Sequence, residues 1–244
     1  MSDTVAERST IRIDGLEGRE TARPGGWRAS RWLAWCELAM VALIFIADWM
    51  HFIPFTKTIF LLALGWVSLR TRGLGWKSVG LGKPEDWRKT VALGLVGGAL
   101  LSAFELFISQ PLLIRLTGEK PDLHDFEVLA GNVKYTLAAL GLVWTVAAFG
   151  EEMVWRGYVM NRVADLGQRT RGAWIASLIT VNLAFGLAHT YQGITGVIEN
   201  ALDGAILAWM YLGARRNLWV PVIAHGVGDT VDLLLIFLGK YPTL

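Results

Sequence analysis

The chain has 244 residues, of which 53% are hydrophobic and 18% are charged, and its mean hydropathy of +0.42 is positive. Typical soluble domains carry about 25% charged residues, so this composition excludes a disordered chain and disfavours a soluble globular domain. The single cysteine, Cys36, excludes an internal disulfide and a zinc-thiolate cluster. In so apolar a chain the net charge of +2 is no argument for nucleic-acid binding, and we expect no nucleic acid among the partners.

Seven apolar windows lie between clusters of charged residues. They cover residues 32–50, 58–69, 91–114, 135–160, 173–189, 194–213 and 218–238. A helix that crosses a hydrocarbon layer of about 30 Å needs roughly 20 mainly apolar residues. The second window is short for this, so it either spans with help from residues 52–56 or re-enters the membrane. We predict an all-α fold, a polytopic helical transmembrane bundle of about seven spans.

The positions of Lys and Arg predict an orientation, because cytoplasmic connections carry an excess of them. With a cytoplasmic N-terminus, the predicted inner segments hold 17 of the 23 basic residues and the outer segments hold five. The remaining one, Arg156, lies inside a window. We therefore expect an integral multi-pass membrane protein in the plasma membrane, with the lipid bilayer as a partner.

The chain divides into three predicted parts. Residues 1–31 contain six basic and five acidic side chains and no apolar core, which predicts a mobile cytoplasmic tail. Residues 32–238 form the predicted transmembrane domain, and residues 239–244 a short C-terminal tail.

Ionisable side chains gather in the later windows, although each costs about 2.5 to 3.5 kcal/mol in hydrocarbon. Residues four apart share a helix face, so we expect Glu152 and Arg156 to form an ion pair with a structural role. Glu151 points elsewhere, beside Trp155, and has no cation on its own face. This carboxylate is therefore a candidate general base.

Two of the four histidines also lie in later windows. Phe185 and His189 share one helix face, and His225 and Asp229 share another. If these helices converge with Glu151, they form one buried polar site that could bind a divalent metal or activate a water. Glu151 lies nearer the inner end of its window and His189 nearer the outer end, so convergence depends on the true helix boundaries.

Taken singly, each of these residues also has a purely structural interpretation. Glu199 and Asp203 share a face, which suits helix-to-helix contacts as well as it suits a water-filled cavity. His51 and His124 have the setting of ordinary surface histidines. The combination favours a site, because packing alone gives no reason for such polar groups to crowd the last windows.

At these residues the sequence resembles the CAAX protease and bacteriocin-processing family of intramembrane proteases, which includes the type II CAAX prenyl endopeptidases. Family members carry the motifs EExxxR, FxxxH and HxxxN or HxxxD, each on a different transmembrane helix. The matching residues occur here in the same order: Glu151, Glu152 and Arg156, then Phe185 and His189, then His225 and Asp229. The motifs place the family-like catalytic core at about residues 135–238.

The resemblance implies a helical membrane enzyme that hydrolyses a peptide bond in a cavity open to the membrane, with a protein or peptide as its substrate. It implies that Glu151 activates the water and that His189 orients this water or stabilises the oxyanion. His225 and Asp229 would complete the catalytic set. The supporting residues would be Glu152, Arg156 and Phe185.

A divalent metal such as zinc stays open as a cofactor, with His189, His225 and Asp229 as candidate ligands. The sequence lacks the HExxH spacing of zinc proteases. Many family members have Asn where this chain has Asp229, and a carboxylate there suits either a metal or the task of fixing the histidine tautomer.

Two other functions remain open. The polar groups would only hold helices together in a non-catalytic membrane scaffold or a bacteriocin-immunity protein. In a proton- or ion-coupled transporter, Glu199, Asp203, Asp229 and Asp232 would act as relay groups. The sequence defines neither the substrate, nor its prenylation, nor the oligomeric state.

Overall fold

The computed structural model describes residues 26–242, and all the regular structure in that range is helical. The predicted all-α fold is confirmed, whereas most of the predicted tail, residues 1–25, lies outside the described residues. Residues 26–29 form one turn of 3-10 helix directly before the first α-helix. The α-helices are α1 (Arg31–Trp49), α2 (Lys57–Thr71), α3 (Trp87–Phe104), α4 (Gln110–Thr117), α5 (Val133–Leu142), α6 (Met160–Leu166), α7 (Arg171–Leu187), α8 (Gly193–Gly213) and α9 (Trp219–Phe237).

Four helical segments in the described chain are long and apolar enough to cross a membrane. These are α1, α9 and the continuous segments Trp87–Thr117 and Val133–Leu166. The pair α7 and α8 passes the same test only together, with a break between them, which gives up to five spans. The predicted seven spans are therefore not confirmed, and α2, with 15 residues, is not among the four.

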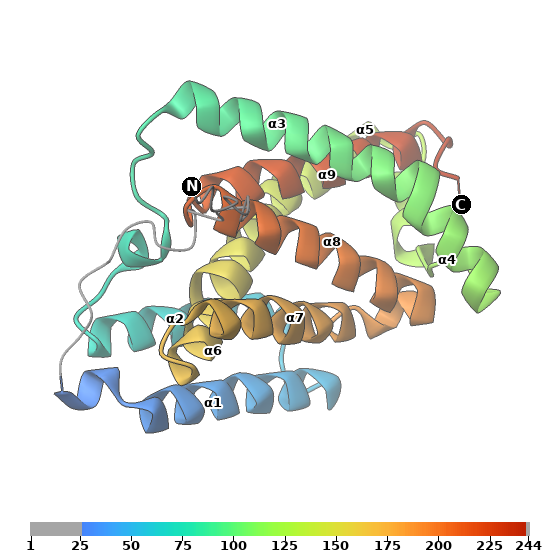
Figure 1. Ribbon diagram of the computed structural model, residues 1–244. Helices are drawn as coiled ribbons and strands as arrows, with labels where there is room; N and C mark the ends of the chain where they lie inside the picture. The colour runs from blue at the N-terminus through green and yellow to red at the C-terminus, as the bar shows by residue number, and fades with distance from the viewer. Residues whose placement is uncertain (1–25, 243–244) are drawn as a thin grey trace, which may run out of the picture.

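The connections collect at two ends of the bundle (Figure 1). At one end the backbone of Leu218 donates a hydrogen bond to that of Gly80, and the guanidinium groups of Arg169 and Arg216 both lie over the ring of Trp174. At the other end the backbone of Asp122 donates to Gln192. The first end holds connections 72–86, 167–170 and 214–217, and we call it the basic end. All three connections were predicted to lie on the inner side.

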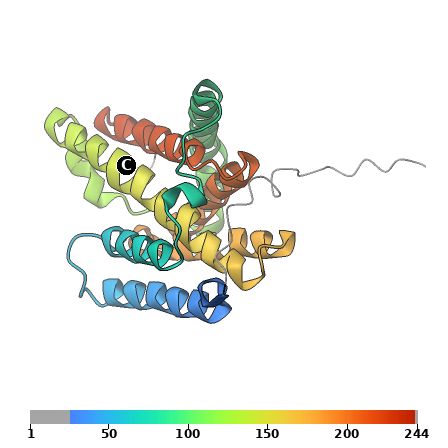
Figure 2. The same cartoon turned by 90° about the vertical axis from the view of Figure 1, so that its left-hand side faces the viewer.

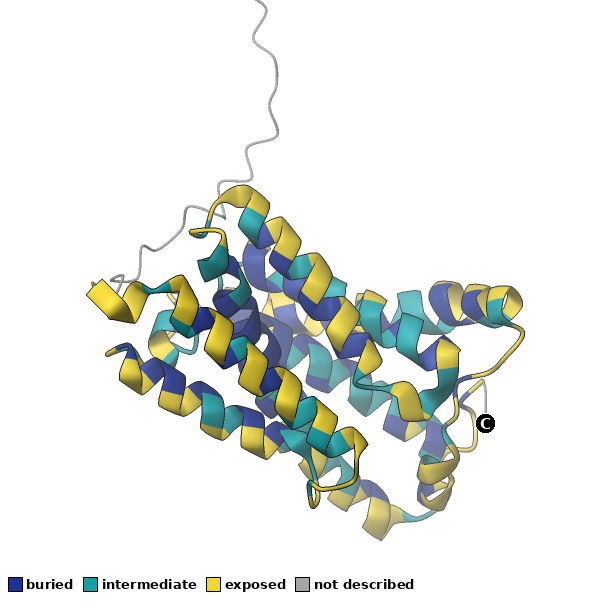
Figure 3. Ribbon diagram, turned by 90° about the horizontal axis from the view of Figure 1, so that it is seen from below, coloured by how far each residue is buried: buried dark blue, intermediate teal, exposed yellow. Residues whose placement is uncertain are grey.

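The segment from α5 to α6 runs through the middle of the bundle (Figure 2). Every residue from 152 to 162 in it is buried, and Val154, Tyr158 and Met160 belong to the largest hydrophobic core. On outer helices such as α1 and α3, buried and exposed residues alternate around each turn (Figure 3). The central segment is therefore placed where its polar side chains must find partners inside the protein.

The central segment is not a regular α-helix. Residues Val143–Glu151 and Met153–Val159 form π-helix, in which each N–H donates to the carbonyl five residues earlier. Such widened turns are rare and occur frequently at functional sites. The EExxxR motif lies across the two π-helical stretches. The spacing rules of a regular α-helix therefore do not by themselves define the face on which each of its side chains lies.

Candidate active site

Arg156 is the buried centre of the site. Its guanidinium donates to the carboxylate of Glu152 over 2.7 Å, and both side chains are fully buried. The second terminal nitrogen donates to the Asn182 side chain (3.2 Å) and to the carbonyl of Gly204 (2.7 Å). The expected ion pair is present, and it also ties the central segment to α7 and α8.

Close approach between α7 and α8 depends on glycine. A Cβ atom on Gly204 would lie 2.7 Å from the Asn182 side-chain oxygen and 2.8 Å from the ring of Phe185. On α7, a Cβ atom on Gly186 would overlap the backbone of Val197. These contacts pair residues in antiparallel order, so α8 returns along α7 and brings its polar residues back into the bundle.

His225 lies between two carboxylates. Its Nδ1 is 3.0 Å from the Glu152 carboxylate and its Nε2 is 3.5 Å from that of Asp229. An imidazolium donates from both nitrogens, whereas a neutral ring can donate to only one of the two acids. The contact with Asp229 follows from the four-residue spacing, but the contact with Glu152, 73 residues away in sequence, was not foreseen.

His189 follows the last residues of α7 and is fixed by its own helix. Its Nδ1 lies 2.8 Å from the carbonyl oxygen of Phe185. A carbonyl oxygen only accepts hydrogen bonds, so Nδ1 carries the proton and Nε2 of the neutral ring is left as an acceptor. The Phe185 ring contacts His189 at 4.8 Å and Trp155 at 5.3 Å between centroids, and the Arg156 guanidinium lies 4.9 Å from it. These contacts bring the end of α7 to the level of the EExxxR motif.

Glu151 ends the first π-helical stretch and is half-buried. Within residues 26–242 no group forms a hydrogen bond or a short ion pair with its carboxylate. It lies within electrostatic range of His225 and Glu152, and Asp229 lies within range of Glu151 and His189. The structure thus gathers the four predicted catalytic residues in one polar site, in which Glu151 is the acid that forms neither a hydrogen bond nor a short ion pair with residues 26–242.

The predicted metal ligands do not form a metal site in this arrangement. Both ring nitrogens of His225 face carboxylates, whereas His189, with Nδ1 on a backbone carbonyl, keeps Nε2 as an acceptor. Within residues 26–242 no three His, Cys, Asp or Glu side chains are arranged to hold a metal ion. The residues present therefore do not fit a zinc ion held by His189, His225 and Asp229.

A second group of acids lies next to Asp229. We call Glu105, Glu199, Asp203 and Asp232 the acidic cluster, because each is within electrostatic range of others in the group. Gln110 donates to Glu199 over 3.4 Å and to Tyr241 over 3.0 Å, and Tyr241 donates to Glu105. One buried oxygen each of Glu199, Asp203 and Asp232 has no hydrogen-bond partner among the described residues. The contributions of Gln110 and Tyr241 were not foreseen.

Comparison with known proteins agrees with the motifs. Residues 133–231 match the family model of the Rce1-like type II CAAX prenyl endopeptidases. The match spans all three motifs and confirms the family resemblance for this segment. No curated protein and no solved structure matches the chain.

Proposed function

We propose that this protein is an intramembrane endopeptidase in which Glu151 activates the attacking water. The observation that carries the proposal is the unequal use of the two adjacent glutamates. Glu152 is committed to Arg156 and His225. Glu151 has no hydrogen bond from the described chain and lies within electrostatic range of His225 and Asp229. A carboxylate that is not already bonded can accept a proton from water.

In the proposed reaction the Glu151 carboxylate takes a proton from water while the water oxygen bonds to the carbonyl carbon of the scissile peptide. The resulting tetrahedral intermediate carries the negative charge on the former carbonyl oxygen. When the C–N bond breaks, the protonated Glu151 gives its proton to the leaving nitrogen. One water is consumed, a carboxylic acid and an amine are formed, and Glu151 returns to its ionised state.

The two histidines have different tasks in this proposal. His189, with its proton on Nδ1, orients the water by accepting a hydrogen bond at Nε2. His225 supplies positive charge near the developing oxyanion. Its 3.5 Å contact with Asp229 is looser than its 3.0 Å contact with Glu152, so Nε2 is the nitrogen that turns to the substrate oxygen. Asp229, Glu152, Arg156 and Phe185 position these rings.

The substrate proposed for this site is a protein or peptide at the membrane. The mechanism uses only side chains of the chain and involves no metal. We further propose that the protein lies in the plasma membrane with its basic end toward the cytoplasm, since basic connections favour that side.

The experiment compares protein and peptide termini in membranes of cells that express the wild type or Glu151→Gln at matched levels. Gln keeps the shape of Glu but cannot take up the proton. New termini with the wild type alone support proteolysis and identify the substrate. Glu119→Gln serves as the matched control, because Glu119 is exposed and lies at the end of the bundle away from the basic end. Cells that express this variant should show the same termini as cells that express the wild type. Identical termini in all three strains would support a scaffold or immunity protein instead.

The acidic cluster favours transport as the second candidate function. Three of its buried oxygens have no partner among the described residues, as expected of groups that exchange protons or ions. Transport predicts that Asp203→Asn abolishes function while Glu151→Gln is tolerated. The endopeptidase proposal predicts the reverse, so the two variants assayed side by side separate the functions.

A further inference from the structure

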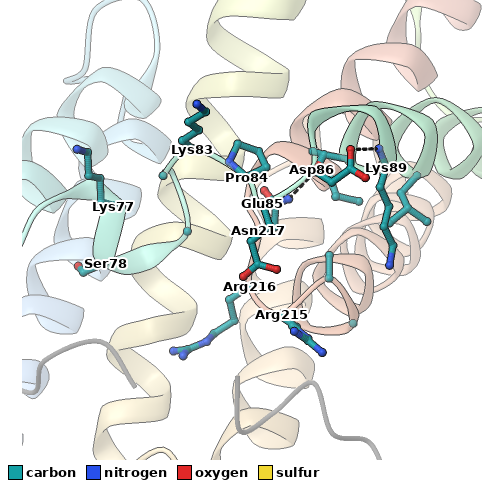
Figure 4. A pocket seen from close by; sticks show the side chains of 17 residues that line it. Lys77, Ser78, Lys83, Pro84, Glu85, Asp86, Lys89, Arg215, Arg216 and Asn217 are labelled. Atoms are coloured by element: carbon teal, nitrogen blue, oxygen red, sulfur yellow. Dashed lines mark hydrogen bonds between the residues drawn. The ribbon is translucent and has the colours of Figure 1, made fainter. Parts of the chain in front are cut away.

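A pocket lies at the basic end, away from the candidate active site. Its volume is about 280 Å³. One wall is the stretch from Lys77 to the first turn of α3, and the other is the turn between α8 and α9 (Figure 4). Both walls come from connections that lead into candidate spans, so the pocket sits where a helix passes from the membrane core to the headgroup region.

The lining of the pocket is predominantly cationic. Its basic side chains are those of Lys77, Lys83, Lys89, Arg215 and Arg216, against the two acids Glu85 and Asp86. Asp86 is already used, since its carboxylate accepts the backbone N–H of Lys89 and caps α3. Lys77, Lys83, Lys89 and Arg215 are exposed and form no ion pair within residues 26–242. The pocket therefore presents a net positive charge to a ligand.

The two walls are fastened to one another, so the pocket exists before a ligand binds. The Asn217 side chain donates to Thr90 over 2.9 Å, and the Trp219 indole donates to the carbonyl of Gly82 over 3.1 Å. Gly80 has a φ of 108°, and a Cβ atom there would overlap the backbone of Arg216. Glycine is therefore required at position 80, where the two walls come into backbone contact.

An apolar surface continues from the pocket along α3. Leu93 lines the pocket, and Val96 and Leu100 follow on the same helix face, with exposed fractions of 45%, 58% and 65%. The other face of α3 packs on α9 through Gly94 and Gly98. The exposed face of α3 is thus directed to lipid, and it begins at the pocket.

We propose that this pocket binds the phosphate of an anionic phospholipid, with one acyl chain along Leu93, Val96 and Leu100. The cations recognise the phosphate, a chemistry that a free phosphate ester would share. The apolar face directly below the cations favours the lipid as its source. Basic pockets between transmembrane helices bind anionic headgroups by the same physics.

The test measures the unfolding temperature of the purified full-length protein in neutral detergent as lipid is added. Phosphatidylglycerol should raise this temperature, whereas phosphatidylcholine, inorganic phosphate and glycerol 3-phosphate should not. In Lys83→Gln/Arg215→Gln the half-maximal effect should need a roughly 30-fold higher phosphatidylglycerol concentration, because each basic residue near a headgroup contributes about fivefold.

The matched control is Lys134→Gln/Arg115→Gln, which removes the same two charge types from exposed positions at the other end. It should respond to phosphatidylglycerol as the wild type does. Equal responses of both double variants would overturn the pocket assignment. Equal stabilisation by glycerol 3-phosphate would overturn the lipid assignment in favour of a soluble phosphate ester. The readout is independent of proteolysis, so it stands or falls separately from the proposed function.

Discussion

Replacement of Arg156 by Met tests whether the buried guanidinium holds the site together. Met matches much of the volume but removes three hydrogen bonds, to Glu152, Asn182 and the carbonyl of Gly204. Among residues 26–242, it leaves the fully buried Glu152 carboxylate with His225 as its only charged partner. Breaking a buried ion pair by removing one partner costs about 3–5 kcal/mol. We expect Arg156→Met to lose free energy of unfolding in that range.

The assay is reversible unfolding in mixed micelles, with Arg115→Met as the control for the same chemical change at an exposed position. The control should stay within about 0.5 kcal/mol of the wild type. Adding Glu152→Gln to Arg156→Met should recover part of the loss, since the orphaned carboxylate is then neutral. A loss below about 1 kcal/mol for Arg156→Met would refute the idea that this residue joins the central segment to α7 and α8.

Two further substitutions test the packing around the site. Gly204→Ala should destabilise the protein by about 1–3 kcal/mol, because the added Cβ atom would collide with Asn182 and Phe185. In Gly141→Ala the added Cβ atom has no neighbour within 4 Å, so this variant should be as stable as the wild type or more stable. Thermal unfolding of the two variants checks this, and equal effects would contradict the close α7–α8 contact. Tyr211→Phe should cost about 1–3 kcal/mol, because it leaves the carbonyl of Val79 without its hydrogen-bond donor. The same unfolding assay checks it, and a wild-type value would mean that this bond contributes nothing.

Local spacing predicted the contacts that lie within one helix. The Glu152–Arg156 pair and the His225–Asp229 contact both follow from a separation of four residues. The distribution of Lys and Arg also predicted that connections 72–86, 167–170 and 214–217 lie at the same end of the bundle. These features depend on periodicity and composition, which a single sequence displays directly.

Contacts between helices could not be predicted, because they depend on how the helices are arranged. Glu37, on α1, is buried and pairs over 2.9 Å with Arg72, which directly follows α2. The bond from Glu152 to His225 joins residues on two separate helices. The π-helical stretches were missed as well, since a change from four-residue to five-residue hydrogen bonding leaves no mark in the composition.

The count of spans shows a third limit. The window at 173–189 was predicted from hydropathy as a separate crossing, and the window at 58–69 as a crossing or a re-entrant segment. The helices there, α2 and α7, have 15 and 17 residues and do not pass alone as candidate spans. Burial against neighbouring helices requires the same apolar composition as contact with lipid. Hydropathy therefore gives the same signal for a short transmembrane helix and for a helix that is buried inside the protein.

The central claim is that the two adjacent glutamates have different tasks, and purified Glu151→Gln and Glu152→Gln test it most directly. The measurement is the cleavage rate per folded molecule, on the substrate that the comparison of termini identifies, beside the unfolding temperature. We predict that Glu151→Gln unfolds at the wild-type temperature and loses about 10²- to 10⁴-fold in rate, as for a removed general base. Glu152→Gln should unfold at a clearly lower temperature, because Arg156 loses its buried partner. Wild-type cleavage by folded Glu151→Gln would contradict the account.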